Sequence, residues 1–259
     1  MTTYLLAPRL FDGERFHSDV AVAVEGERIA ALVPAAELPA GVRAQRFERG
    51  TLAPGFIDLQ VNGGGGVLLN NSPTVDAVDR MAAGHRRAGT TGLVPTLISD
   101  TPETQRAAVA AVAEARQRGN RSVLGVHVEG PFFAPSRRGT HRADMIRSPS
   151  DADLDWLTSL GELPVLLTLA PEHLLPGQLR RLADAGIRVF AGHTDASYEQ
   201  AAAAIAEGLH GFTHLFNAMS PLTGRAPGTV GAALDHSDSF VGIIADGHHV
   251  HPASIRVAQ

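Results

Sequence analysis

The chain contains neither cysteine nor lysine, and these two absences limit its possible chemistry. Without cysteine there is no disulfide, no thiolate metal ligand and no cysteine nucleophile, so any bound metal must take nitrogen and oxygen ligands. Without lysine, arginine carries all 22 basic positions. This excludes Schiff-base catalysis, a P-loop lysine and a carboxylated lysine that bridges two metal ions.

Basic charge and long apolar runs are also scarce. A net charge of -5 and a pI near 6.2 provide no long basic face, so we expect a small-molecule partner and neither nucleic acid nor membrane. No apolar run approaches the roughly 20 residues of a membrane span, and the N-terminus lacks a basic segment followed by an apolar stretch. We therefore expect a cytoplasmic protein. Its 259 residues, 44% of them hydrophobic, can bury a substantial core.

The pattern of apolar residues divides the chain into two parts. Residues 1–50 alternate apolar and polar side chains between Gly or Pro breaks, which predicts a small, incomplete β-sandwich module. Residues 51–259 alternate apolar runs with helical segments. The predicted strands are 56–61, 92–97, 123–128, 164–169, 187–192, 211–216 and 240–245. The predicted helices, several with Ser or Thr at the start and Gly at the end, are 72–89, 101–119, 148–160, 174–186 and 197–208.

Alternating strands and helices of this length indicate a parallel sheet with helices outside it. A (β/α)8 TIM-type barrel and a doubly wound sheet both fit the pattern. Polar side chains that could bind a metal follow strands three, five and six, and only a closed barrel gathers so many strand ends around one axis. We therefore expect a barrel in residues 51–259 with seven strands present. The eighth is missing, because residues 251–259 indicate the start of the helix after strand seven.

Three side chains that could bind a metal occupy equivalent places in three strand units. Glu129 lies in HVEGPF, His193 in AGHTDAS and His214 in FTHLFNAM. Each alone is more often a capping, ion-pairing or hydrogen-bonded core residue. Their recurrence just past a strand favours one metal site, because divalent transition metals accept imidazole and carboxylate ligands and leave a position open in catalytic sites.

Two amides and a glycine run follow the first barrel strand. Gln60 and Asn62 alternate with Val61, so both are predicted to face the barrel interior. Their amides are weaker metal ligands than imidazoles, which argues for a single ion. The glycines at 63–66 fit either a phosphate cradle or a loop that needs positive φ, and they lack the GK[ST] ending of a P-loop.

Three further polar residues lie in predicted loops, where a solvated surface role and a functional role are both open. His141 occurs in RRGTH, and His249 occurs in DGHHVH after strand seven. Arg225 lies in LTGRAPG beyond strand six, where a guanidinium suits a phosphate or carboxylate group.

Taken in order, several motifs form a recognisable set. They are PGFIDLQVNGGGG, TTGLVPT, HVEGPFF followed by RGTH, AGHTDAS, THLFNAMSPLTGRAPG and ADGHHV. This set resembles the N-acetylglucosamine-6-phosphate deacetylase family of the amidohydrolase superfamily. The resemblance implies a metal-dependent barrel enzyme that converts N-acetylglucosamine 6-phosphate to glucosamine 6-phosphate and acetate. It also implies one divalent ion, Zn²⁺ in first place with Fe²⁺ or Mn²⁺ as alternatives, and a homodimer at full length.

The resemblance also assigns roles to individual residues. Glu129, His193 and His214 match the metal ligands, and His141 matches a catalytic residue near the N-acetyl group. Other amidohydrolases carry HxH after strand one, whereas the QVN sequence resembles the single-metal branch. The residues expected to bind substrate are Gln60, Asn62, His141, Asn217, Ala218, Arg225 and His249.

The proton-transfer group is the point at which this chain departs from the pattern. In this family the general base is an aspartate at the end of strand eight, and neither Asp58 nor Asp246 matches that position. We therefore predict that the 259-residue chain retains the metal ligands and lacks this group. The alternatives are a truncated, non-catalytic remnant that binds metal or sugar phosphate, and another amidohydrolase such as a cyclic-amide hydrolase or a deaminase.

Overall fold

Residues 1–259 are all described by the computed structural model, and they divide into two units, Met1–Phe56 and Ile57–Gln259. The first unit contains a four-stranded sheet in the order β5-β4-β1-β6 and a three-stranded sheet in the order β3-β2-β7. Its strands are β1 (Thr2–Leu6), β2 (Arg9–Phe11), β3 (Phe16–His17), β4 (Val20–Glu25), β5 (Arg28–Pro34), β6 (Ala44–Arg46) and β7 (Thr51–Leu52), with a 3-10 turn at Ala35–Glu37. The β4–β5 pair is antiparallel, as an alternating pattern broken by Gly26 predicts.

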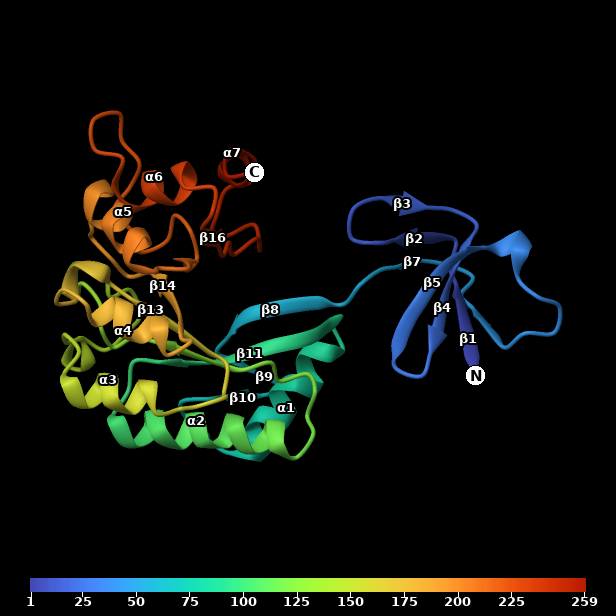
Figure 1. Ribbon diagram of the computed structural model, residues 1–259, viewed down its shortest axis with the longest axis horizontal. Helices are drawn as coiled ribbons and strands as arrows, with labels where there is room; N and C mark the ends of the chain where they lie inside the picture. Colours follow the sequence, from blue (N-terminus) through green and yellow to red (C-terminus); the bar gives the residue numbers. More distant parts are fainter. The chain divides into compact units, whose positions relative to one another are not determined.

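The second unit is built on a seven-stranded sheet in the order β16-β15-β14-β13-β12-β11-β8. Its strands are β8 (Phe56–Val61), β11 (Thr90–Ile98), β12 (Val126–Glu129), β13 (Val165–Leu169), β14 (Arg188–Ala191), β15 (Gly211–Phe212) and β16 (Phe240–Val241), and a small hairpin pairs β9 (Gly63–Gly64) with β10 (Val67–Leu68). Neighbours from β11 to β16 pair in parallel, and the sheet curls into an incomplete (β/α)8 barrel (Figure 1). The predicted fold is confirmed.

Helices follow the strands, and most of the predicted helices are present. They are α1 (Val75–Arg86), α2 (Pro102–Gln117), α3 (Asp151–Thr158), α4 (Gln178–Asp184), α5 (Tyr198–Glu207), α6 (Gly228–Asp235) and α7 (Pro252–Val257). Three short 3-10 helices lie at η2 (Pro135–Arg137), η3 (Ala143–Met145) and η4 (Pro171–His173). The side chains of Thr74, Thr101, Ser150 and Ser197 cap α1, α2, α3 and α5. None of the helices combines the length and the apolar composition that crossing a bilayer would require.

Helix α6 was not predicted, and strands β15 and β16 are much shorter than the predicted runs. Residues 228–233 of α6 are all buried, so the helix has no polar face and no amphipathic period to reveal it. The run at 211–216 is extended only over Gly211–Phe212, because the backbone turns at His214 (φ 39°) and at Phe216 (φ 79°).

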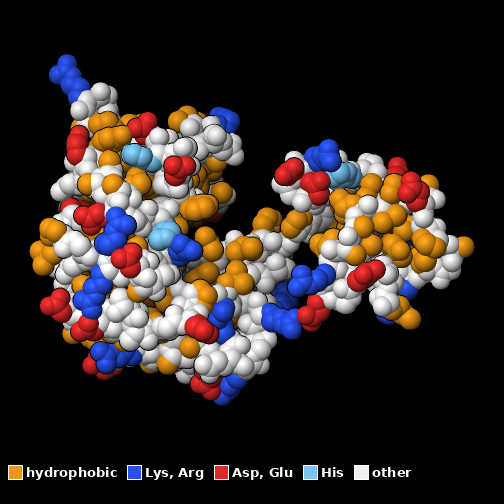
Figure 2. Space-filling view, in the orientation of Figure 1, with side chains coloured by type: hydrophobic (Ala, Val, Ile, Leu, Met, Phe, Trp, Pro, Cys, Tyr) orange, Lys and Arg blue, Asp and Glu red, His pale blue; other side chains and the backbone are white.

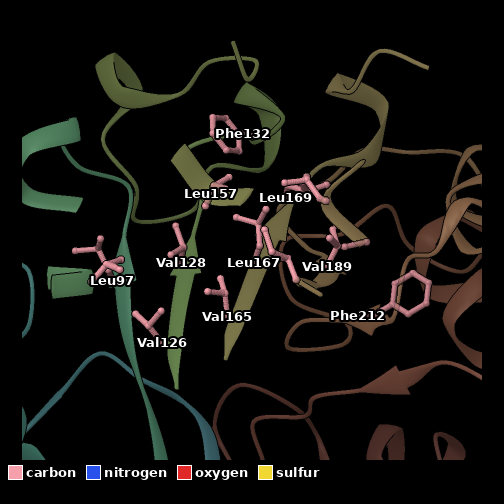
Figure 3. Packing of buried hydrophobic residues seen from close by; sticks show 14 of the residues in the cluster. Leu97, Val126, Val128, Phe132, Leu157, Val165, Leu167, Leu169, Val189 and Phe212 are labelled. Atoms are coloured by element: carbon pink, nitrogen blue, oxygen red, sulfur yellow. The ribbon is translucent and has the colours of Figure 1, made fainter. Parts of the chain in front are cut away.

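The core lies between the sheet and the helices, and the strands supply it with every second side chain. Val126 and Val128 of β12 point into this layer beside Leu167 of β13 (Figure 3). Burying such a side chain contributes about 1.5–3 kcal/mol. The alternate residues of β12, His127 and Glu129, therefore face the interior of the barrel.

The inner face of the sheet lines a cavity of about 860 Å³. Gln60, His127 and His214 contribute polar atoms to its lining, and Leu166 and Phe212 are among its apolar residues. On the surface drawn in Figure 2, basic and acidic side chains are interspersed. Mixed signs give little long-range attraction for a polyanion. The cavity also reaches Gly161, Pro164 and Gly186, which precede β13 and β14, so it is the open interior of the incomplete barrel.

Candidate functional site

Three buried side chains converge at the C-terminal ends of the barrel strands. Glu129 is the last residue of β12, His193 follows β14, and His214 follows β15. The Nε2 atoms of the two histidines lie 3.0 Å apart, and Glu129 Oε1 lies 3.4 Å from His193 Nε2 and 3.3 Å from His214 Nε2. Their exposed fractions are only 3–6%. Glu129 precedes His193 by 64 residues and His214 by 85 residues in the sequence, and the sheet brings the three side chains together.

This donor set fits a divalent transition metal. Ligand atoms that bind a tetrahedral ion at about 2.1 Å lie about 3.4 Å from one another. The triangle formed by Glu129, His193 and His214 has edges of 3.0, 3.3 and 3.4 Å. Two imidazoles and a carboxylate also match the preferences of Zn²⁺ and similar ions. Together they form a candidate metal site.

Hydrogen bonds around His193 prepare it to bind a cation. Its Nδ1 donates to the carbonyl oxygen of Arg137 at 2.8 Å, so Nε2 carries the free lone pair. The Phe133 ring stacks on the imidazole with a centroid distance of 4.3 Å. By contrast, the buried Nδ1 of His214 has no hydrogen-bond partner. The ring of His193 is therefore the more tightly oriented of the two.

Glu129 is held as a carboxylate. Gln60 Nε2 donates to Glu129 Oε1 at 2.7 Å. Burial acts to raise the pKa of Glu129, but its close contacts with the imidazoles of His193 and His214 outweigh this effect, so the pKa lies well below its ordinary value. Gln60 thus contacts the cluster directly, on the side of strand β8.

His141 is a neutral imidazole next to the cluster. Its ring lies 4.6 Å from that of His193, measured between centroids, and only 1% of the residue is exposed. The backbone N–H of Ser99 donates to His141 Nδ1 at 3.2 Å, and Ser99 Oγ lies 2.8 Å from the same nitrogen. Burial lowers the pKa of His141 to about 4. Since Nδ1 accepts, the ring proton is on Nε2, which is a hydrogen-bond donor.

A buried polar ladder that sequence reasoning missed runs across the strands below the cluster. His127 Nε2 lies 2.7 Å from Thr168 Oγ1, which lies 2.7 Å from Thr213 Oγ1. On the other side, His127 Nδ1 lies 3.1 Å from Thr96 Oγ1. Burial lowers the pKa of His127 to about 4, so this ring is also neutral. Its position two residues before Glu129, on the same strand face, was the signal available in the sequence.

Left-handed backbone is concentrated at this site. The non-glycine residues with positive φ here are His193 (51°), His214 (39°), Phe216 (79°) and Ala218 (49°), and the one other such residue is Asp19. Such conformations cost about 1–3 kcal/mol each and persist where the surroundings enforce them, which is common at functional sites.

The family follows from comparison with known proteins. Residues 51–259 match the amidohydrolase family. The chain belongs to this family. An N-acetylgalactosamine-6-phosphate deacetylase from Shewanella sp. strain ANA-3 is 45% identical over 82% of this chain and 54% of its own length. An N-acetylglucosamine-6-phosphate deacetylase from Haemophilus influenzae is 38% identical over 92% of this chain and 63% of its own.

Solved structures give the same result. The N-acetylglucosamine-6-phosphate deacetylase of Pasteurella multocida superposes with a TM-score of 0.94 at 34% identity, over 100% of this chain and 68% of that one. A mutant of the Mycobacterium smegmatis enzyme, in complex with N-acetyl-D-glucosamine-6-phosphate, gives 0.85 at 31% identity, over 100% and 66%. The chain thus spans about half to two thirds of the length of these relatives.

Other residues expected at the site of this amidohydrolase lie further from the cluster. Asn217 Nδ2 donates to the carbonyl of His214 at 3.3 Å, so the turn at 217–218 adjoins a member of the cluster. Arg225 is exposed in the loop between β15 and α6. His249 is exposed, with Nδ1 2.7 Å from Asp246 Oδ2, and Asn62 is half-buried. Neither Arg225 nor His249 belongs to the candidate metal site formed by Glu129, His193 and His214.

The glycine run after β8 is explained by close packing on helix α1. A Cβ atom on Gly64 would lie 2.6 Å from the His85 ring, and one on Gly65 would lie 2.5 Å from the Arg80 carbonyl. The carbonyls of the run accept hydrogen bonds from the helix: His85 Nε2 lies 2.9 Å from Gly63 O. Of the two interpretations left open by the sequence, these contacts favour a backbone requirement over a phosphate cradle.

Proposed function

We propose that this chain carries the metal centre and the acetamide-binding side of an amino-sugar phosphate deacetylase. The reaction is hydrolysis of the acetamide of N-acetylglucosamine 6-phosphate to glucosamine 6-phosphate and acetate. The observation that carries the proposal is the triangle of Glu129, His193 and His214 beside a neutral His141 with a proton on Nε2. The names of the relatives support the same substrate class.

In this proposal Glu129, His193 and His214 hold one divalent ion. Zn²⁺ is the first choice because two imidazoles and one carboxylate leave a fourth tetrahedral position open, and Fe²⁺ or Mn²⁺ are alternatives. When bound, the ion supplies the electrophilic activation of water and carbonyl that amide hydrolysis requires. Gln60 orients the Glu129 carboxylate.

His141 takes the role of an electrophilic donor. Its Nε2–H would donate to the acetyl oxygen and stabilise the negative charge that develops there, a contribution of about 3–4 kcal/mol for one donor in a comparable site. Because Ser99 fixes the tautomer and burial keeps the ring neutral, His141 can polarise the carbonyl and cannot act as a cationic acid near neutrality.

The sugar phosphate is assigned to the residues beyond strands six and seven. Asn62 and the Asn217–Ala218 turn would contact the sugar, while Arg225 and His249 would bind the phosphate. Arg225 is exposed on a loop. In this proposal the full-length protein is a homodimer, and the Arg225 guanidinium could serve the site of the second copy. A phosphorylated sugar substrate suits a cytoplasmic enzyme.

A second candidate function is binding without turnover. The one carboxylate in the metal cluster is Glu129, which the ion would occupy. The Asp58 carboxylate accepts a hydrogen bond from the backbone N–H of Gln60. The Asp246 carboxylate accepts hydrogen bonds from the backbone N–H groups of His248 and His249. No second carboxylate stands in the cluster to serve as a general base.

Acetate release and ligand binding together separate these candidates. The 259-residue protein, loaded with Zn²⁺, is assayed for acetate from N-acetylglucosamine 6-phosphate and from its galactosamine analogue, with calorimetry of both sugars in parallel. The galactosamine analogue is included because the relative that is 45% identical is named an N-acetylgalactosamine-6-phosphate deacetylase. Acetate release abolished by Glu129→Gln supports the deacetylase, and binding without release supports the second candidate. The proposal would be overturned if the protein neither bound either sugar phosphate nor released acetate from it.

A further inference from the structure

Glu172 binds the two residues that follow His193 but does not touch the metal cluster. It lies in η4, directly after β13, and is half-buried. Its Oε2 accepts a hydrogen bond from Thr194 Oγ1 at 2.5 Å, and its Oε1 accepts one from the Asp195 backbone N–H at 2.6 Å. Both oxygens of one carboxylate are therefore committed to the segment after β14.

This segment needs external support. His193 has a φ of 51°, a left-handed conformation that L-residues rarely adopt. On one side, the loop after β12 holds it, because Ala134 N–H donates to the His193 carbonyl at 2.9 Å and the Arg137 carbonyl accepts from His193 Nδ1. On the other side, the Glu172 carboxylate accepts hydrogen bonds from Thr194 and Asp195, and such charge-assisted bonds are roughly twice as strong as neutral ones.

The support extends through Thr194 to the next turn. Thr194 is fully buried, its N–H donates to the Ala218 carbonyl at 3.1 Å, and its carbonyl accepts from Ser220 N–H at 3.1 Å. Ala218 also has a left-handed φ, of 49°. Glu172 therefore fixes Thr194, and Thr194 fixes the turn that follows His214.

We propose that Glu172 is a positioning residue for the metal centre, acting through Thr194 and Asp195 on His193. The proposal rests on the metal-binding role of His193 given above. Removing the carboxylate frees the Thr194 hydroxyl and the Asp195 amide, so the segment after the left-handed His193 loses two of the hydrogen bonds that hold it. His193 Nε2 then departs from the triangle that fits the ion. Outer-shell partners of this kind typically change metal affinity by about 10–100-fold.

The test compares Glu172→Ala and Glu172→Gln with Glu48→Gln, which makes the same charge change at an exposed position in the first unit. Zn²⁺ affinity is measured by competition with a chromophoric chelator, and hydrogen exchange at the Asp195 amide is measured without metal. We expect Glu172→Ala to lower Zn²⁺ affinity at least about tenfold. Glu172→Gln retains one acceptor oxygen, so its loss should be smaller. The Asp195 amide should exchange faster in both, and Glu48→Gln should match the unmodified chain.

Hydrogen exchange keeps the outcomes distinguishable. If the unmodified chain binds no Zn²⁺, the proposed function fails, while faster exchange of the Asp195 amide in the Glu172 variants still supports the positioning role. If Glu172→Ala does not fold, Glu172→Gln carries both measurements. Unchanged Zn²⁺ affinity together with unchanged Asp195 exchange in a folded Glu172 variant would overturn the inference.

Discussion

At the scale of single residues, the inner face of the sheet carries two kinds of side chain: proposed metal ligands and members of a hydrogen-bonded ladder. The layer at the strand ends carries Glu129 and the other proposed ligands, whereas the layer below it carries His127 and Thr168 in a hydrogen-bonded ladder. Among buried groups such a ladder stabilises the fold only when every member is paired. The ladder connects β12, β13 and the start of the loop after β15, so it fixes the strand ends on which the ligands stand.

Replacing Thr168 with Val should therefore destabilise the protein although the two side chains have nearly the same shape. The change leaves His127 Nε2 and Thr213 Oγ1 without their shared partner, and an unsatisfied buried polar group costs about 1–3 kcal/mol. Urea unfolding measures the difference in free energy. Thr158→Val is the matched control, because Thr158 is partly exposed and should change stability by about 0.5 kcal/mol or less. Equal effects of the two substitutions would contradict this account.

How far the sequence predicts a residue's role depends on how local its signal is. Glu129, His193 and His214 share a position just past an apolar strand, and that recurrence is visible without coordinates. The partners of Ser99, His127 and Glu172 lie 42, 41 and 22 residues away in the sequence. No local pattern encodes those pairs, because they arise only when the strands lie side by side.

At the element scale, helices were predictable where caps and amphipathic patterns coincide. Helix α3 begins with a capping box between Ser150 and Asp153, and Arg147 adds an ion pair to the same carboxylate at 2.5 Å. Helix α6 begins after Pro227 without a side-chain cap and is buried on nearly all sides, so neither signal marked it. Its existence depends on tertiary packing, which a local pattern does not contain.

The start of α3 should confer a pH-dependent part of the stability. Burial acts to raise the pKa of Asp153, but hydrogen bonds from Arg147 and Ser150 outweigh it and lower the pKa to about 2. A lowered folded pKa means that the stabilisation is complete above the unfolded value of 3.8 and is lost as the pH falls towards 2. After allowance for the half-exposed Arg147, we expect about 1 kcal/mol.

Unfolding of the unmodified chain and of Asp153→Asn, followed from pH 7 to the lowest pH at which both fold, measures this contribution. The difference in free energy should be present at pH 7 and should shrink below pH 4. Asp151→Asn removes a carboxylate from the same first turn that makes no ion pair with Arg147, so it is the control and should cost less stability at pH 7. A gap between Asp153→Asn and the unmodified chain that stays constant over this range would count against the assignment.

At the scale of the whole molecule, the fold was predictable because each βα unit carries its own signal, and the curled parallel sheet is the sum of those units. The metal cluster is a property of the assembled sheet, since its donors come from β12, β14 and β15. An ion that binds this cluster therefore binds the folded second unit, Ile57–Gln259, and has no equivalent site in the first unit, Met1–Phe56. Binding and folding of the second unit are consequently linked.

Metal loading should therefore stabilise the second unit selectively. At a free Zn²⁺ concentration of about 100 times Kd, linkage raises the free energy of unfolding by about 2.7 kcal/mol. Hydrogen exchange, resolved by peptide, should show slower exchange within Ile57–Gln259 and unchanged exchange within Met1–Phe56, and a chelator should reverse the effect. Glu129→Gln should abolish the response, because it weakens the carboxylate ligand while preserving its shape. Equal protection of both units, or an undiminished response in Glu129→Gln, would show that the ion binds elsewhere and that the triangle of Glu129, His193 and His214 is not its site.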